Sequence, residues 1–210
     1  SQRGIDMTLS EFDNEIRKDY NVVCGCDEAG RGPLAGDVFA AAVIFDKDTV
    51  IEGINDSKKL TAKKREELFD EIMEKAVDFS IQTATVEEIE DINILNAAML
   101  AMKRAVEDMD TKPDVCLIDG NKTPEGLECP AIAVVKGDAK SQAVAAASIL
   151  AKVARDRYME QMAEQYPEYR FEKHKGYGTK LHYQMIDQYG PCGIHRMSFL
   201  KKYYAKKNGH

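Results

Sequence analysis

The feature that most constrains this chain is an apolar run that leads directly into two adjacent carboxylates and a glycine-rich loop. Residues 22–26 are apolar apart from one glycine, and Asp27 and Glu28 follow at once. Three glycines come next: Gly30, Gly32 and Gly36. Glycines let the backbone turn sharply and let a ligand approach it closely. The pattern predicts a strand that ends at a ligand-facing loop, with an ordinary turn as the alternative.

Two further apolar runs end in the same way, with a carboxylate at the exit. Residues 115–118 lead to Asp119, and residues 131–135 lead through a Lys-Gly pair to Asp138. Because ligands of open α/β sheets bind at strand ends, these acids are expected to meet at one site. An Asp-Gly pair after a strand is also a common turn, which leaves a structural role open for Asp119.

The remaining pattern indicates a sheet with helices on both faces. Residues 38–45 are almost all apolar, as in a strand buried on both sides. The other expected elements are a short helix capped by Ser10, a helix capped by Thr61, a half-buried strand over 79–86, a helix over 94–109, a long helix from Ser141 to Pro167 and an amphipathic helix over 181–186. Within the long helix, Arg155-Asp156-Arg157 is expected to form a surface ion-pair group.

Composition limits the class of protein. The chain has 210 residues, 44% of them apolar and 31% charged, which is typical of a globular protein with one core. No apolar run is long enough to cross a bilayer, so a cytoplasmic location is expected. The five cysteines are odd in number and lie mostly in apolar segments, which favours reduced thiols over disulfides or a zinc site.

Charge is distributed unevenly along the chain. The net charge is −7, yet residues 170–210 carry nine Lys or Arg against two Asp or Glu. Such a basic end is either a solvated face or a surface that follows a phosphate backbone. Three regions are distinguished: an N-terminal segment (1–20) without motifs, a candidate catalytic domain (21–168) that holds the acids at the strand ends, and a basic C-terminal segment (169–210) as the candidate for contact with the substrate.

Taken together, the motifs resemble those of bacterial ribonuclease HII, the type 2 ribonuclease H family, over residues 22 to about 199. The segments that carry the resemblance are Asp27-Glu28-Ala29-Gly30-Arg31-Gly32, Asp56-Ser57-Lys58, Ile118-Asp119-Gly120, Lys136-Gly137-Asp138, the alanine-rich segment 146–152, His174-Lys175-Gly176-Tyr177 and His195-Arg196 with Ser198-Phe199. The resemblance implies a ribonuclease H-like three-layer α/β fold, in which helices flank a five-stranded mixed sheet and a helical segment follows at the C-terminus.

The resemblance also implies that four acids are catalytic and bind two divalent ions, Mg²⁺ or Mn²⁺: Asp27, Glu28, Asp119 and Asp138. Hard cations prefer carboxylate oxygens and stabilise the charge of phosphodiester hydrolysis. Acids crowded in one cleft repel each other, so raised pKa values are expected. Adjacent residues of an ideal strand face opposite ways, so Asp27 and Glu28 reach one site only if the strand twists, bulges or ends there.

Substrate contacts are implied for a second set of residues: Gly30, Arg31, Gly32, Lys58, Ser148, Lys175 and Tyr177. In this interpretation the backbone of the Gly-Arg-Gly motif contacts a ribose 2′-hydroxyl, and the Tyr177 ring packs on the next deoxyribose. His174 and His195 are expected to be packing residues.

The implied function is an endoribonuclease that hydrolyses RNA in RNA–DNA hybrids and incises 5′ of single ribonucleotides in duplex DNA, leaving 3′-hydroxyl and 5′-phosphate ends. Its expected roles are ribonucleotide excision repair and RNA primer removal, and a monomer is expected. Two alternatives remain: another two-metal nuclease or phosphatase on the same fold, and a module that binds hybrids without cutting them.

Overall fold

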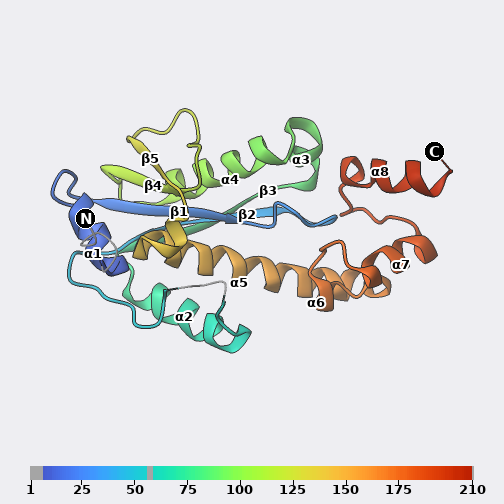
Figure 1. The fold of residues 1–210 in the computed structure, drawn as a ribbon, viewed down its shortest axis with the longest axis horizontal. Coiled ribbons are helices and arrows are strands. Elements are labelled where there is room, and N and C mark those ends of the chain that lie inside the picture. The colour runs from blue at the N-terminus through green and yellow to red at the C-terminus, as the bar shows by residue number, and fades with distance from the viewer. Residues whose placement is uncertain (1–6, 56–58, 210) are drawn as a thin grey trace.

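The computed structural model describes residues 7–55 and 59–209, and its centre is a five-stranded sheet (Figure 1). The strands are β1 (Val23–Ala29), β2 (Val38–Ile44), β3 (Asp78–Ala84), β4 (Val115–Asp119) and β5 (Ala131–Val134). Their spatial order is β3-β2-β1-β4-β5. The pairs among β1, β2 and β3 are antiparallel, whereas β1 with β4 and β4 with β5 are parallel. The expected mixed sheet is therefore confirmed.

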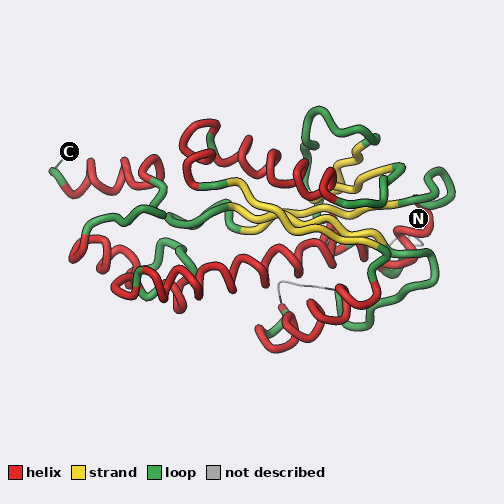
Figure 2. Tube along the Cα trace, turned by 180° about the vertical axis from the view of Figure 1, so that it is seen from behind, coloured by secondary structure: helices red, strands yellow, loops and turns green. Residues whose placement is uncertain are grey.

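Helices cover both faces of the sheet, which gives three layers (Figures 1 and 2). One face carries α3 (Val86–Ile92) and α4 (Ile94–Asp108), and the other carries α1 (Leu9–Ile16), α2 (Ala62–Lys75) and α5 (Gln142–Gln165). All residues of β2 are buried because alternate side chains enter the two cores: Ala40 and Ala42 pack toward α4, Ala41 and Val43 toward α5.

The long helix α5 lies unusually close to β1. A Cβ atom at Gly25 would lie 2.2 Å from the backbone carbon of Ala143, so only glycine fits there. Small residues continue along the buried face of α5, including Ala146 and Ala147. This close packing brings the middle of α5 beside the end of β1, where the acidic loop begins.

The C-terminal segment extends beyond one end of the sheet (Figure 1). It contains η4 (Pro167–Tyr169), α6 (Phe171–His174), α7 (Lys180–Tyr189) and α8 (Met197–Lys207). Its centre holds the buried rings of Phe171, His174, His182 and His195. The packing roles expected for His174 and His195 are confirmed, since both are buried and hydrogen-bonded.

Three expectations were wrong. The strand expected over 79–86 is β3, which ends at Ala84, and Val86 begins α3 because Thr85 caps a helix there. The residue that caps α1 is Thr8 rather than Ser10, because Thr8 and Glu11 exchange side-chain and backbone hydrogen bonds of 3.2 Å in a capping box. The group around Asp156 is not a surface cluster: Arg155 is only 2% exposed, and Asp156 pairs with Lys152 at 2.9 Å instead.

The N-terminal helix is tied to the main domain by a buried carboxylate. Asp13 accepts hydrogen bonds from the Ser141 hydroxyl at 2.6 Å and from the Ala143 N–H at 2.9 Å. Burial raises the pKa of Asp13 to about 6, although both hydrogen bonds oppose the shift. Asp13 therefore helps Ser141 to cap α5, a role that nothing in its own sequence neighbourhood indicates.

The cysteines agree with the expectation of reduced thiols. All five are free, and three of them, Cys24, Cys26 and Cys116, are buried in the core. Among the described residues, no helix is both long and apolar enough to cross a membrane.

Candidate active site

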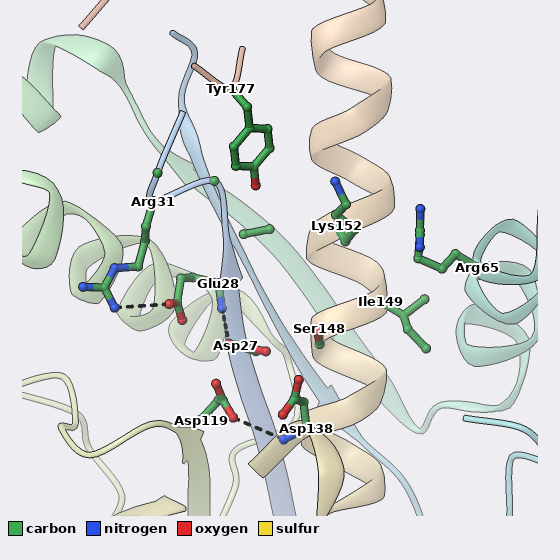
Figure 3. A pocket seen from close by; sticks show the side chains of 13 residues that line it. Asp27, Glu28, Arg31, Arg65, Asp119, Asp138, Ser148, Ile149, Lys152 and Tyr177 are labelled. Atoms are coloured by element: carbon green, nitrogen blue, oxygen red, sulfur yellow. Dashed lines mark hydrogen bonds and ion pairs between the residues drawn. The ribbon is translucent and has the colours of Figure 1, made fainter. Parts of the chain in front are cut away.

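The predicted acids line one cleft at the ends of β1 and β4 (Figure 3). The cleft has a volume of about 490 Å³. Its walls come from the end of β1 and the loop after it, the end of β4, η3 (Gly137–Ala139), the middle of α5, and residues of α2 and the C-terminal segment. Nine of the predicted site residues line it: Asp27, Glu28, Gly30, Arg31, Gly32, Asp119, Asp138, Ser148 and Tyr177.

The sheet topology explains why three acids that are far apart in sequence meet. β1 and β4 are parallel neighbours in which Cys26 pairs with Ile118, so Asp27 and Asp119 leave the sheet at the same edge. β5 is parallel to β4 and leads into η3, which carries Asp138. The backbone N–H of Asp138 donates to Asp119 Oδ1 at 3.2 Å, which ties the Asp119 carboxylate to the segment that carries Asp138.

Asp27 and Glu28 both reach the cleft without a break in β1. The strand stays paired with β2 through both residues, so it neither ends nor bulges between them. Its pairing with β4, however, stops one residue earlier, at Cys26. Beyond that point β1 has no paired neighbour on its β4 side, and the side chains of Asp27 and Glu28 both line the cleft there (Figure 3). Both acids therefore reach the cleft from a continuous strand, at the point where its pairing with β4 has stopped.

Burial and mutual repulsion make the site reluctant to hold negative charge. Burial raises the pKa of Asp27 well above its ordinary value, and the charges of Glu28 and Asp119 raise it further. Burial also raises the pKa of Asp119, with a contribution from the charge of Asp138. The expectation of raised pKa values is confirmed for these two acids. A bound cation would relieve both the desolvation and the repulsion.

The four carboxylates line one cleft, but among the described residues they are not close enough together to form a ready-made metal-binding group. In the part of the chain that the structure describes, no three His, Cys, Asp or Glu side chains form a ready metal-binding group. Two of the acids have a local contact: Asp27 Oδ1 accepts from the Glu28 N–H at 2.8 Å, and Glu28 lies 3.6 Å from the Arg31 guanidinium. The donor set, four carboxylates in one cleft, nevertheless fits hard divalent cations, which bind oxygen ligands.

The loop of residues 30–37, here called the glycine-rich loop, forms one wall of the cleft. Gly30 has φ +94°, and a Cβ atom there would lie 2.1 Å from Arg155 Nε, so internal packing alone requires glycine. A Cβ atom at Gly32 would only touch Tyr177, at 3.8 Å. Gly32 is thus the glycine of the motif that leaves open space on the cleft side.

A second wall is formed by α5, and Tyr177 lies between α5 and the glycine-rich loop (Figure 3). Ser148 and Lys152 are four residues apart on α5 and therefore share one helix face. The Lys152 ammonium lies 5.8 Å from the centre of the Tyr177 ring, which is 41% exposed. Lys152 on α5 and Arg65 on α2 also line the cleft, and neither of them was selected from the sequence. The spacing to Ser148 would have indicated Lys152, whereas no local signal marks Arg65.

One predicted substrate contact, Lys175, lies elsewhere. The Lys175 ammonium pairs with Glu160 at 3.1 Å and donates to the Glu172 carbonyl at 2.7 Å, and this residue does not line the cleft. Lys58 lies outside the described residues.

The fold and the site together define a class. A mixed five-stranded sheet between helical layers, with carboxylates at the ends of its central strands, is the architecture of ribonuclease H-like enzymes. The structure resembles that of ribonuclease H2 from Pyrococcus horikoshii OT3, with a TM-score of 0.74 and 29% identity over 90% of this chain and 100% of the other. Bst-RNase HIII in complex with Mn²⁺ has the same fold at 16% identity, with a TM-score of 0.66 over 90% of this chain and 71% of the other.

The sequence comparisons identify the family. The family model described as ribonuclease HII matches residues 24–202. Ribonuclease HII of Caldicellulosiruptor saccharolyticus is 54% identical over 94% of this chain and 97% of its own length. The chain belongs to the ribonuclease HII family, and it is a ribonuclease H, a hydrolase that acts on RNA–DNA hybrids.

Proposed function

We propose that this enzyme incises duplex DNA on the 5′ side of a single embedded ribonucleotide, as well as cutting RNA in hybrids, and leaves 3′-hydroxyl and 5′-phosphate ends. The observation that carries the proposal is the shared cleft, in which four acids face the glycine-rich loop and Tyr177. The acids supply ligands for reaction at a phosphate, and the loop and ring offer contacts for the sugars on either side.

The proposed roles of the acids follow from their chemistry. Asp27, Glu28, Asp119 and Asp138 would hold two divalent ions, Mg²⁺ or Mn²⁺, which when bound activate water and stabilise the leaving oxygen. The Mn²⁺ complex of Bst-RNase HIII, a protein of the same fold, supports a divalent metal. Because the pKa of Asp27 and of Asp119 is raised, protons compete with cations at this site, so metal affinity should increase with pH.

The remaining cleft residues would bind and orient the nucleic acid. Arg31, Lys152 and the Ser148 hydroxyl lie where they can meet phosphate oxygens, and Lys58 is proposed to do the same. The backbone at Gly32 is open to the 2′-hydroxyl of the ribose. The Tyr177 ring would pack on the following deoxyribose, so that the site recognises an RNA-to-DNA junction. We assign the enzyme to ribonucleotide excision repair and primer removal, acting as a cytoplasmic monomer.

The test uses a labelled DNA duplex with one ribonucleotide, incubated with the enzyme and Mg²⁺ or Mn²⁺. We expect one cut on the 5′ side of the ribonucleotide and a product with a 3′-hydroxyl that a polymerase extends. Cleavage of long hybrids without incision at the single ribonucleotide would contradict the junction proposal. Tight binding of both duplexes without any cleavage would favour the non-enzymatic alternative.

A further inference from the structure

The glycine-rich loop directs most of its carbonyl groups toward two buried arginines. Arg196 donates to four of these carbonyl oxygens at 2.7–3.0 Å, those of Gly30, Arg31, Pro33 and Gly36. Arg155 donates to two more, those of Ala35 and Asp37, at 2.8 and 3.2 Å. Six of the eight carbonyls of residues 30–37 therefore bind one of two guanidinium groups that come from distant parts of the chain.

Both arginines are buried without a carboxylate partner. Arg155 is 2% exposed and Arg196 is 0% exposed, and burial lowers the pKa of both. In the described part of the chain, neither guanidinium forms a salt bridge. Since a buried charge is costly unless it is fully hydrogen-bonded, the loop carbonyls are what keep these cations inside. The arginines and the loop conformation therefore depend on each other.

Among the described residues of this loop, Gly32 is the one whose N–H and C=O both lack a hydrogen-bond partner. Across residues 7–55 and 59–209, no donor reaches the Gly32 carbonyl, and no acceptor is placed for its N–H or for that of Arg31. Gly32 also lines the cleft, where a Cβ atom would meet only the Tyr177 ring, at 3.8 Å. A sugar hydroxyl, which both donates and accepts, matches this pair of groups.

Arg155 also connects the loop to the segment that carries Tyr177. Its Nη1 donates to the Lys175 carbonyl at 2.8 Å, and the Leu34 N–H of the loop donates to the Gly176 carbonyl at 2.8 Å. The Arg155 guanidinium lies 5.9 Å from the centre of the Tyr177 ring. The two segments that face the sugars are thus held by the same side chain.

We propose that Arg155 and Arg196 are positioning residues for ribose recognition: they bind the competing carbonyls of the glycine-rich loop and so hold the free N–H and C=O of Gly32 toward the sugar in the cleft. This inference rests on the proposed function, because it concerns the same sugar site. Lysine would keep the charge but has one nitrogen instead of a planar fork, so it cannot bind three or four carbonyls in one plane.

The test measures binding rather than turnover. Affinities of wild type, Arg155→Lys, Arg196→Lys and the control Arg157→Lys are measured in EDTA, by fluorescence anisotropy, for two duplexes that differ only in one 2′-hydroxyl. Arg157 is a matched control because it lies on the same helix but pairs with Glu66 at the surface. For wild type we expect about a tenfold preference for the ribonucleotide duplex, equivalent to one net hydrogen bond.

The expected result is a preference that falls to less than about twofold in Arg155→Lys and Arg196→Lys, with all-DNA affinity unchanged and Arg157→Lys like wild type. An unchanged preference in the two lysine variants overturns the inference, and so does an equal loss of affinity for both duplexes, which indicates general damage. If the lysine variants do not fold, Gly30→Ala, which forces a Cβ atom against Arg155, tests the same ratio. A wild-type preference of one overturns hydroxyl reading itself, so the two failures are distinguishable.

Discussion

At the scale of single residues, the carboxylates of the cleft should not tolerate exchange for amides. In Asp27→Asn, Asp119→Asn or Asp138→Asn the shape is kept but a charged oxygen ligand is lost, so kcat should fall by roughly 100-fold or more. The control is Asp156→Asn, which loses only the ion pair with Lys152 and should keep most activity. Circular dichroism checks that each variant is folded. Near-normal turnover in Asp27→Asn would exclude the proposed metal site.

Tyr177 should matter more for one substrate than for another. Only a single ribonucleotide in DNA places a deoxyribose under its ring. A ring contact that the substrate covers contributes about 1–2 kcal/mol. Tyr177→Ala should therefore reduce kcat/KM for the single-ribonucleotide duplex by about tenfold more than for a long hybrid. Tyr177→Phe, which keeps the ring, should retain the wild-type ratio. Equal losses on both substrates in Tyr177→Ala would leave the ring with a general packing role.

At the scale of secondary-structure elements, a feature could be predicted from the sequence when neighbouring residues cause it, and could not when distant residues do. The strand exits at Asp27, Asp119 and Asp138 could be predicted, because an apolar run followed by an acid is a local pattern and parallel strands end at one edge. The burial of Arg155 could not, since its partners are carbonyls about 120 residues away, and backbone acceptors carry no sequence signal. The parallel partner of β1 ends before β1 does, which was equally invisible.

The buried Asp13 that links α1 to α5 should make the protein less stable as pH rises. The pKa of Asp13 is raised from 3.8 to about 6, so the folded state binds more protons than the unfolded state between these values. Stability from this group is therefore complete below pH 3.8 and is lost as pH rises through 6, by about 3 kcal/mol at most. Asp13→Asn resembles the protonated acid. As pH rises from 4 to 7, its free energy of unfolding, measured with urea, should increase relative to that of wild type by up to this amount. Parallel curves for the two proteins would contradict this assignment.

The histidines of the C-terminal segment should act in the opposite direction. The Cys192 N–H donates to His195 Nδ1 at 2.8 Å, so the proton of the His195 ring is on Nε2. His195 Nε2 therefore donates to His182 Nε2 at 2.9 Å. His182 then carries its proton on Nδ1, which donates to the Tyr177 carbonyl at 2.9 Å. Both rings are therefore neutral, and a proton added to either breaks the chain. Burial lowers the pKa of both to about 4, so stability of the segment is complete above pH 6.5 and is lost as pH falls toward 4.

Amide hydrogen exchange, corrected for intrinsic rates, tests this directly. Protection of residues 174–196 should fall by roughly tenfold or more between pH 7 and pH 5, because each histidine would gain its proton only in the opened state. Protection in β2, which has no histidine, provides the internal comparison. Equal changes in both regions would show that the histidine chain is not responsible.

At the scale of the whole molecule, charge is separated along the long axis. Residues 170–210 carry nine of the 29 Lys and Arg but two of the 36 Asp and Glu, and they form the segment that extends beyond the sheet (Figure 1). Four of these lysines, Lys201, Lys202, Lys206 and Lys207, are exposed on α8. A basic extension on an acidic body can follow a phosphate backbone while the body repels DNA elsewhere.

Binding should therefore weaken steeply with salt, and α8 should account for part of the slope. Each phosphate contact that is removed lowers the slope of log K against log salt by about one unit. The double variant Lys201→Ala and Lys202→Ala should therefore reduce the slope by up to about two units. Its preference for a duplex with a ribonucleotide should not change. Lys18→Ala and Lys75→Ala, which remove exposed lysines paired with Glu15 and Glu71 on α1 and α2, should leave the slope unchanged. Anisotropy titrations between 50 and 300 mM salt (about sixfold in concentration) measure it. A slope that is the same in wild type and the α8 variant would mean that these lysines are only solvated and that the contacts to the backbone come from the cleft itself.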